Sequence, residues 1–398
     1  MLSRRSFLGG ATAVALTTPT KGHASSDEEQ ALIDRAMVGI DADRFIDTHV
    51  HVIGNGAGGT GCTVHPRMTD AWSHPMDWIR FQVYTRASGI TDLSRADQEY
   101  LEVLQQRVHA MPHQGRTFLL AFDGVYDEQG RPQPEATVFH TPTKHVLQAA
   151  KIDSRFAAVA SIHPYRLDAA EALHEAADGG AVAVKWLPNA MWIDPSSPLC
   201  DRAYKTMAER GLPLICHAGE EQAVHAEDTQ EFGNPLRLRR ALDQGVTVIV
   251  AHCASHGFSR DLDTPGHPPT SSFELFLRMM DNENHIGQLW GEISAVTLLN
   301  RVKTAVPALL KRTDLHHRLV HGSDYPIPGV DPLINLWQLW ALGLIRWEDR
   351  APLAQLFNKN PILGDFVLKR IFITEDERAE GFPPSVFCPP WSLFPNLR

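Results

Sequence analysis

Eight short apolar runs, separated by helical patterns, place the strongest constraint on the fold of this chain. The runs lie at Arg44–Val50, Thr117–Phe122, Phe156–Ile162, Ala181–Leu187, Leu212–Cys216, Val246–Ala251, Gln288–Ile293 and Arg318–Val320. Continuous apolar runs of this length are typical of strands that are buried on both faces of a parallel sheet. Helical patterns between most of them, such as Ala169–Ala177 and Leu199–Arg210, predict repeated strand–helix units.

Polar residues follow the ends of several runs at a regular spacing. Lys185 and His217 are 32 residues apart, His217 and His252 are 35 apart, and His252 and Asp324 are 72 apart, which equals two further units. A strand–helix unit takes about 30 residues or more. Eight such units, with polar residues at the strand ends, predict an α/β fold of the (β/α)8 barrel type with its site on the C-terminal face.

The 398 residues fit one such barrel with additions. The long connection at residues 51–116 is predicted to form a lid or a pocket wall. It begins with a Gly-rich stretch that matches a dinucleotide fingerprint but does not open a helix, so no nucleotide site is predicted. Residues 371–398 form a tail that is expected to pack extended against the barrel. Residues 25–398 are therefore predicted to form a single domain.

The N-terminus resembles a twin-arginine export signal. Arg4 and Arg5 precede an apolar run at Ala11–Leu16, and Gly22-His23-Ala24 has the small residues of a cleavage site. Residues 1–24 thus predict recognition by the export machinery and a periplasmic or secreted location. The alternative is that this short basic N-terminal segment has no role in export. No segment has the length of a membrane span.

Charge and composition narrow the classes of partner. The chain has 37 Lys and Arg against 47 Asp and Glu, a net charge of −10, which argues against nucleic acid because phosphate contacts need a basic face. Its 20 His outnumber five scattered Cys, so a metal site is expected to use imidazole and carboxylate ligands. A small-molecule substrate is expected, and a homo-oligomer is left open.

Four histidines carry the metal prediction. His49 and His51 end the first run, and alternate residues of a strand share a face, so both can bind one metal. Chance alone supplies about one His-x-His in a chain with this many histidines, so the position of the pair is the informative feature. A single strand-end His is more often a hydrogen-bonded structural imidazole. His217 and His252, in successive units, favour ligands instead.

Lys185 and Asp324 each leave two interpretations open. Lys185 lies in an apolar run, so its ammonium either reaches solvent or is paired, neutralised or modified. Asp324 follows the last run and either caps a helix or serves as a metal carboxylate and proton acceptor. Substrate-binding residues are not assigned. Weaker candidates for a carboxylate partner or another polar role are Arg67, Arg80, His163, Arg166, Glu220, Glu221 and Glu292.

Together these residues resemble the amidohydrolase superfamily, specifically its amidohydrolase-2-like branch. The resemblance covers roughly residues 43–365 and rests on residues that occur in the family's order. They are His49, His51, Lys185, His217, His252 and Asp324, followed by Asn358-Lys359-Asn360-Pro361. The resemblance implies a (β/α)8 barrel that binds one or two divalent metal ions at its C-terminal face.

The resemblance also implies roles for these side chains. His49, His51 and Asp324 would bind the first metal, and His217 joins them in mononuclear members. In binuclear members a carboxylated Lys185 bridges two metals, and His217 and His252 hold the second. The metal count stays open, and the ligand types favour zinc.

The function implied is a metal-dependent hydrolase that directs a metal-activated water at a small amide, lactone or ester. Asp324 would accept the proton, and His252 would help the metal to polarise the carbonyl. One alternative is a metal-dependent nonoxidative decarboxylase of a small carboxylic acid. The other is a noncatalytic periplasmic binding protein on a barrel scaffold.

Overall fold

The computed structural model describes residues 25–222, 224, 227–373 and 381–397. The predicted export signal, residues 1–24, lies outside these ranges, so export and the periplasmic location stay predictions. Within the described ranges, no helix combines the length and the apolar character that crossing a membrane requires.

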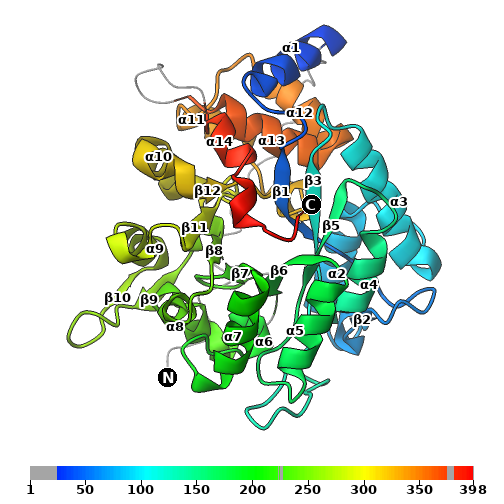
Figure 1. Cartoon of the computed structure of the whole chain (residues 1–398). Coiled ribbons are helices and arrows are strands. Elements are labelled where there is room, and N and C mark those ends of the chain that lie inside the picture. The colour runs from blue at the N-terminus through cyan, green and yellow to red at the C-terminus, as the bar shows by residue number, and fades with distance from the viewer. Residues whose placement is uncertain (1–24, 223, 225–226, 374–380, 398) are drawn as a thin grey trace.

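Eight parallel strands form one sheet, in the same order as along the chain (Figure 1). They are β1 (Ile46–His51), β3 (Arg116–Leu120), β5 (Phe156–Ala160), β6 (Ala181–Trp186), β7 (Leu214–His217), β8 (Val248–Ala251), β11 (Leu289–Glu292) and β12 (Leu319–Val320). Each predicted apolar run supplies one strand. The predicted barrel fold is therefore confirmed.

Backbone hydrogen bonds between β1 and the segment that follows β12 join the two ends of the sheet. The His51 N–H donates to the Tyr325 carbonyl at 2.9 Å, and the Asp324 N–H donates to the His49 carbonyl at 2.8 Å. Three of these four residues belong to the predicted metal site, and the fourth, Tyr325, follows Asp324 directly. Closure of the barrel brings the first-strand histidines next to Asp324.

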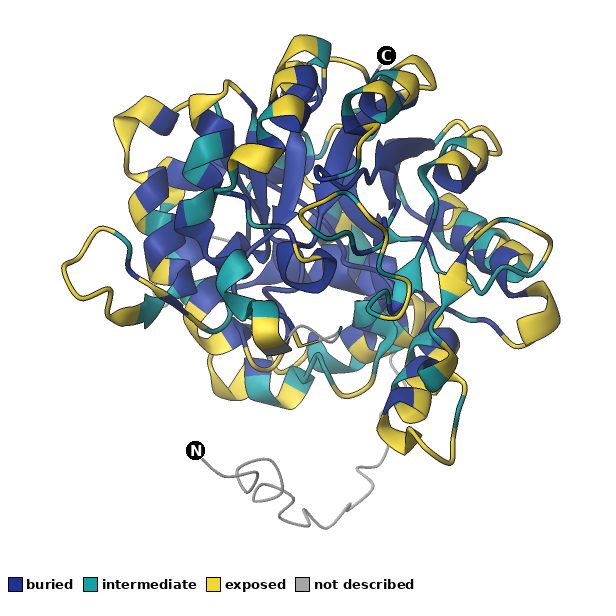
Figure 2. Cartoon of the chain, turned by 90° about the horizontal axis from the view of Figure 1, so that it is seen from below, coloured by how far each residue is buried: buried dark blue, intermediate teal, exposed yellow. Residues whose placement is uncertain are grey.

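Helices surround the strands, and most of them have exposed outward faces, while the strands of the barrel are largely buried (Figure 2). They are α1 (Ser26–Met37), α2 (Pro75–Ala87), α3 (Ala96–His109), α4 (Thr143–Ala149), α5 (Ala169–Asp178), α6 (Pro188–Met191), α7 (Asp201–Arg210), α8 (Arg239–Asp243), α9 (Ser272–Met280), α10 (Val302–Lys311), α11 (Leu336–Ala341), α12 (Arg350–Lys359), α13 (Pro361–Ile371) and α14 (Pro384–Phe387). Two antiparallel pairs lie outside the barrel sheet: β2 (Thr63–Val64) with β4 (Phe139–His140), and β9 (Phe258–Arg260) with β10 (Pro269–Ser271).

Local sequence signals set several helix ends. Helix α1 begins with a capping box, in which the Ser25 hydroxyl accepts from the Glu28 N–H and the Glu28 carboxylate accepts from the Ser25 N–H. Helix α7 ends at Gly211, whose φ of 60° is left-handed, a conformation that glycine adopts at little cost. The chain can then turn directly into β7.

The described part of the C-terminal tail, residues 381–397, reaches the end of the barrel opposite the strand C-termini. Leu393, Phe394 and Leu397 join a core cluster with inward-facing strand residues, and the Phe394 ring lies 4.7 Å from that of Phe118. Figure 1 shows the tail, in red, crossing the centre of the barrel. Residues 381–397 contain α14 and a short 3-10 turn at Trp391–Leu393.

Candidate metal and active site

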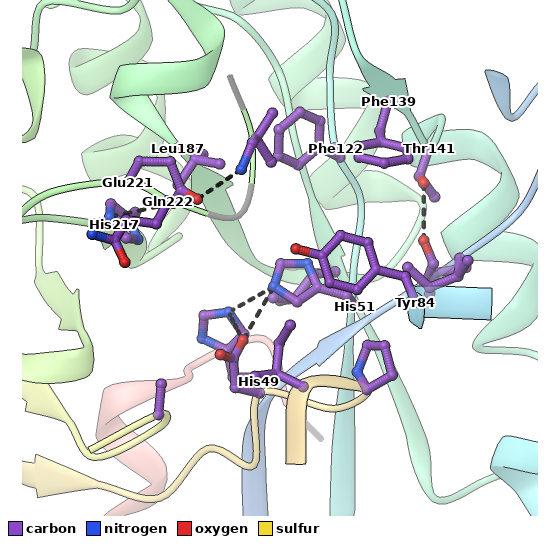
Figure 3. Close-up of a pocket in the computed structure, with 18 of the residues that line it drawn as sticks. His49, His51, Tyr84, Phe122, Phe139, Thr141, Leu187, His217, Glu221 and Gln222 are labelled. Atoms are coloured by element: carbon purple, nitrogen blue, oxygen red, sulfur yellow. Dashed lines mark hydrogen bonds and ion pairs between the residues drawn. The ribbon is translucent and has the colours of Figure 1, made fainter. Parts of the chain in front are cut away.

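A cavity of about 370 Å³ opens at the C-terminal ends of the strands. Every residue predicted to bind metal lines it: His49, His51, Lys185, His217, His252 and Asp324. Helix α2, from the long insertion, adds Phe81 and Tyr84 to the wall. The barrel therefore brings side chains from β1, β6, β7 and the segments after β8 and β12 into one site (Figure 3).

Three ligand-type atoms lie unusually close together. His49 Nε2 is 3.2 Å from His51 Nε2, and Asp324 Oδ1 is 3.4 Å from the first and 3.3 Å from the second. A tetrahedral metal site with bonds of about 2.0–2.1 Å separates its ligand atoms by about 3.3 Å. The three atoms are thus spaced as ligands of one ion, and the rings of His49 and His51 point toward one another in Figure 3.

Glu292 fixes the orientation of His49. Its carboxylate lies 2.6 Å from His49 Nδ1 and also accepts from the Thr48 hydroxyl at 2.7 Å and the Ser294 hydroxyl at 2.5 Å. Burial raises the pKa of Glu292, but the His49 ring and the Lys185 ammonium lower it to about 2. An ionised carboxylate only accepts, so Nδ1 carries the proton and Nε2 presents its lone pair to the cavity.

The hydrogen bonds of His252 indicate which of its ring nitrogens is protonated. Its Nδ1 lies 2.8 Å from the Ser294 hydroxyl, which donates to Glu292, and 3.2 Å from the Ser294 carbonyl, which only accepts. Nδ1 must therefore be the protonated nitrogen. Because burial lowers the pKa of His252 well below its ordinary value, the ring is neutral and Nε2 is a lone-pair donor. That nitrogen can bind a metal or accept a proton, but it cannot donate to a carbonyl.

His217 lies beside His252, with ring centroids 5.3 Å apart. Its buried Nε2 makes no hydrogen bond within the described chain and lies 3.5 Å from Glu221 Oε2. In Figure 3 it stands next to Glu221, away from the His49–His51 pair. Burial lowers the pKa of His217 well below its ordinary value, so the ring has the neutral form that metals bind.

Lys185 does not reach solvent. It is 2% exposed, and its Nζ lies 3.3 Å from His49 Nε2. Burial lowers the pKa of Lys185, although the carboxylates of Glu292 and Asp324 act in the opposite direction. A lysine whose amine is readily neutral can react with carbon dioxide to form a carbamate. Both the modified and the unmodified Lys185 are therefore compatible with this position.

The Asp324 side chain faces the histidines rather than a helix end, and it has an unusual backbone. Its φ is +61°, and that of His252 is +56°, in a left-handed region that non-glycine residues seldom occupy. Asp47 supports this turn, because its Oδ1 accepts from the Ser323 N–H at 2.8 Å and the His49 N–H at 3.1 Å. Such conformations persist where surrounding contacts fix them, and they cluster at functional sites.

Arg301 is the cavity residue that the sequence did not reveal. It is 8% exposed, its Nη1 donates to the Ser255 hydroxyl at 3.3 Å, and its buried Nε has no hydrogen-bond partner within the described chain. Among the weaker sequence candidates, Glu221 lines the cavity and Glu292 contacts His49. Four others lie elsewhere: Arg166 pairs with Asp123 and Asp168, Arg67 and Arg80 with Asp77, and His163 with the Met191 carbonyl. None of these four lines the cavity.

Replacing Glu292 with Gln should weaken metal binding about 10–100-fold, the usual loss when the partner of a ligating His is removed. The amide keeps the volume but loses the charge that fixes the His49 tautomer. Metal affinity, measured by competition with a chromophoric chelator, tests this. Glu274→Gln, an exposed change on α9, is the control. Unaltered affinity in Glu292→Gln would show that His49 needs no charged partner.

Comparisons with known proteins identify related sequences and folds. The amidohydrolase family's sequence model matches residues 46–362. No curated protein matches the chain. One similar structure is described as a probable 2-pyrone-4,6-dicarboxylic acid hydrolase from Acinetobacter baumannii, with 14% identity, a TM-score of 0.44, and coverage of 79% of this chain and 99% of that one.

Two further structures show comparable similarity. A 4-oxalomesaconate hydratase from Rhodopseudomonas palustris has 11% identity and a TM-score of 0.44, covering 89% of this chain and 96% of that one. A 5-carboxyvanillate decarboxylase from Novosphingobium aromaticivorans, with bound manganese, has 10% identity and a TM-score of 0.44, covering 78% and 94% respectively.

Proposed function

Since this chain belongs to the amidohydrolase family, we propose that it is a metal-dependent hydrolase of a small carbonyl compound such as an amide, lactone or ester. The observation that carries the proposal is the mutual spacing of His49 Nε2, His51 Nε2 and Asp324 Oδ1, at 3.2–3.4 Å. Family membership supports an enzyme, and so argues against the noncatalytic binding protein.

His49, His51 and Asp324 would hold a divalent ion, with His217 and His252 as further ligands in one or two positions. The nitrogen and oxygen donors suit zinc, and they also accept other first-row divalent ions. An ion bound here supplies Lewis acidity and lowers the pKa of its water ligand toward 7, a shift of many units from 15.7. Zinc is our proposal for its identity.

The protein's own groups then move the proton. Burial raises the pKa of Asp324, but the neighbouring His51 and His49 rings and Lys185 hold it below its ordinary value, so this carboxylate is ionised at neutral pH. Asp324 can accept a proton from the attacking water and return it to the leaving group. The Nε2 lone pair of His252 is a second proton acceptor wherever it does not bind metal.

Arg301 and the aromatic wall define the class of substrate. A buried guanidinium whose Nε lacks a partner is costly unless an anion completes its hydrogen bonds. Phe81, Tyr84, Phe122 and Phe139 line the same cavity. We therefore propose a compact, largely apolar substrate that bears a carboxylate for Arg301.

The proposed preference for a carboxylate also supports a second candidate function, nonoxidative decarboxylation. A nonoxidative decarboxylase of a small aromatic or unsaturated acid would also need Arg301, the aromatic wall and the metal ligands. The two reactions differ in the bond broken: hydrolysis adds water across an acyl bond, whereas decarboxylation releases carbon dioxide and leaves a proton on carbon.

One experiment tests both candidates. The purified chain is assayed for bound metal and then given a panel of lactones, amides, esters and acids, with and without chelator. Incorporation of oxygen from labelled water supports hydrolysis, and carbon dioxide release supports decarboxylation. Full activity of metal-free protein would contradict both proposals.

Replacing Arg301 with Met should raise KM for a carboxylated substrate about 10–100-fold, because a charge-assisted hydrogen bond is worth roughly 1.5–3 kcal/mol. The change keeps an apolar stem but removes the charge. Arg346→Met, a change at a half-buried arginine that does not line the cavity, is the control. The steady-state kinetics of the free acid and of its methyl ester distinguish the roles, since the ester should lose little. Equal effects on acid and ester would contradict carboxylate recognition by Arg301.

A further inference from the structure

Outside the cavity, three ligand-type side chains from separate parts of the chain meet in the interior. Cys62 ends the Gly-rich loop after β1, Asp97 lies in α3 and His145 in α4. Their ligand atoms all lie within 4.8 Å of one another, and the residues are 2%, 1% and 6% exposed. None of the three lines the cavity.

His145 gives this cluster an unsatisfied donor or acceptor. Its Nε2 is buried and has no hydrogen-bond partner within the described residues. Buried polar atoms in native proteins almost always have a hydrogen-bond partner, so a buried atom without one needs a physical explanation. A cation between the imidazole, the thiol and the carboxylate would supply the missing interaction.

Asp97 retains capacity for such a cation. Its carboxylate accepts from the N–H groups of Asn55, at 2.7 Å, and Gly56, at 3.2 Å, and from the Thr60 hydroxyl. A carboxylate offers about four acceptor positions, so these three donors leave one, which the Cys62 thiol contacts and which a cation would take when the thiol loses its proton. The Gly-rich loop is packed closely around it, since a Cβ on Gly54 would lie 2.6 Å from Asp97 Oδ2.

We propose that Cys62, Asp97 and His145 bind a structural zinc ion, separate from the ions of the cavity. A thiolate, an imidazole and a carboxylate form a donor set that suits zinc, whereas magnesium and calcium prefer oxygen alone. Binding exchanges the Cys62 S–H bond for a sulfur–metal bond and releases one proton to solvent. Burial raises the pKa of the metal-free thiol to about 12, so the ion itself must drive that proton loss.

The position of the cluster gives the ion a role. Gly54, Thr63 and Val64, at the two ends of the same loop, line the cavity. An ion held by Cys62, α3 and α4 would join this loop to two helices and fix one wall of the cavity. This inference stands independently of the proposed reaction.

Cobalt substitution tests the site, because a thiolate bound to cobalt(II) gives a charge-transfer absorption in the near ultraviolet that nitrogen and oxygen ligands do not. The full chain, stripped of metal and reloaded with cobalt, should show this absorption. Cys62→Ser should abolish it and reduce the bound metal by one ion per chain. Cys388→Ser, a change at a half-buried free thiol, should retain both.

His145→Gln is the second variant, since it leaves every thiol in place and removes one ligand. It should also lose the absorption and one ion. Circular dichroism establishes that each variant is folded. Absence of the absorption from the cobalt-loaded wild-type chain, or its persistence in Cys62→Ser, would overturn the proposal.

Discussion

Replacing Asp324 with Asn should reduce kcat/KM by about 10³-fold, within the range of about 10²–10⁴ that general acid–base groups contribute. The amide has the same shape but a negligible basicity, so it cannot accept the proton of the attacking water. Its N–H group can also donate to the Nε2 lone pair of His49 or His51, which lie 3.4 and 3.3 Å from the native carboxylate oxygen, and so compete with the metal for these nitrogens. Steady-state kinetics on a metal-saturated enzyme measure the loss.

Metal content must be measured with the kinetics, because Asp324 is proposed both to bind the ion and to accept the proton. A variant that retains much of its metal but loses activity about 10³-fold isolates the proton-transfer role. Loss of both in proportion would assign Asp324 to binding alone. Asp314→Asn changes an exposed carboxylate that does not line the cavity and should leave both unaltered. Full activity in Asp324→Asn would contradict the site.

The barrel and its ligands were predictable because both depend on short-range sequence patterns. Buried parallel strands produce continuous apolar runs, and each strand must end where its backbone leaves the sheet. His217 ends β7, and His252 follows β8 directly. The same reasoning placed Asp324 after the last run, and closure of the barrel brings it within 3.4 Å of His49.

Features that depend on long-range contacts were not predictable in this way. Arg301 stands eight residues beyond the seventh run, in a sequence that shows nothing of its burial. The tautomer of His252 depends on its contacts with Ser294, which the sequence does not reveal. The Cys62 cluster joins a loop to two helices, whereas the sequence shows only a scattered cysteine. A thiolate ligand there would also depart from the expected imidazole and carboxylate chemistry.

Replacing His51 with Ala should remove the metal from the first site and reduce activity to background. His51 supplies one of the three atoms spaced at 3.2–3.4 Å, and its loss leaves a hole where water must substitute for imidazole. The affinity loss should exceed the 10–100-fold expected for Glu292→Gln, because a direct ligand contributes more than the group that orients one. Metal analysis after dialysis, together with the assay, measures both effects.

Thermal unfolding provides a readout that does not depend on turnover. An ion that binds only the folded chain stabilises it by about 2.7 kcal/mol at 100 times its Kd. Chelation should therefore lower the Tm of the wild-type chain more than that of His51→Ala, which has already lost the ion. Added metal should restore Tm and activity to the stripped wild type and not to the variant. His317→Ala, an exposed change, should behave as wild type. Retention of metal and activity by His51→Ala would show that the close contact with His49 and Asp324 is not a metal site.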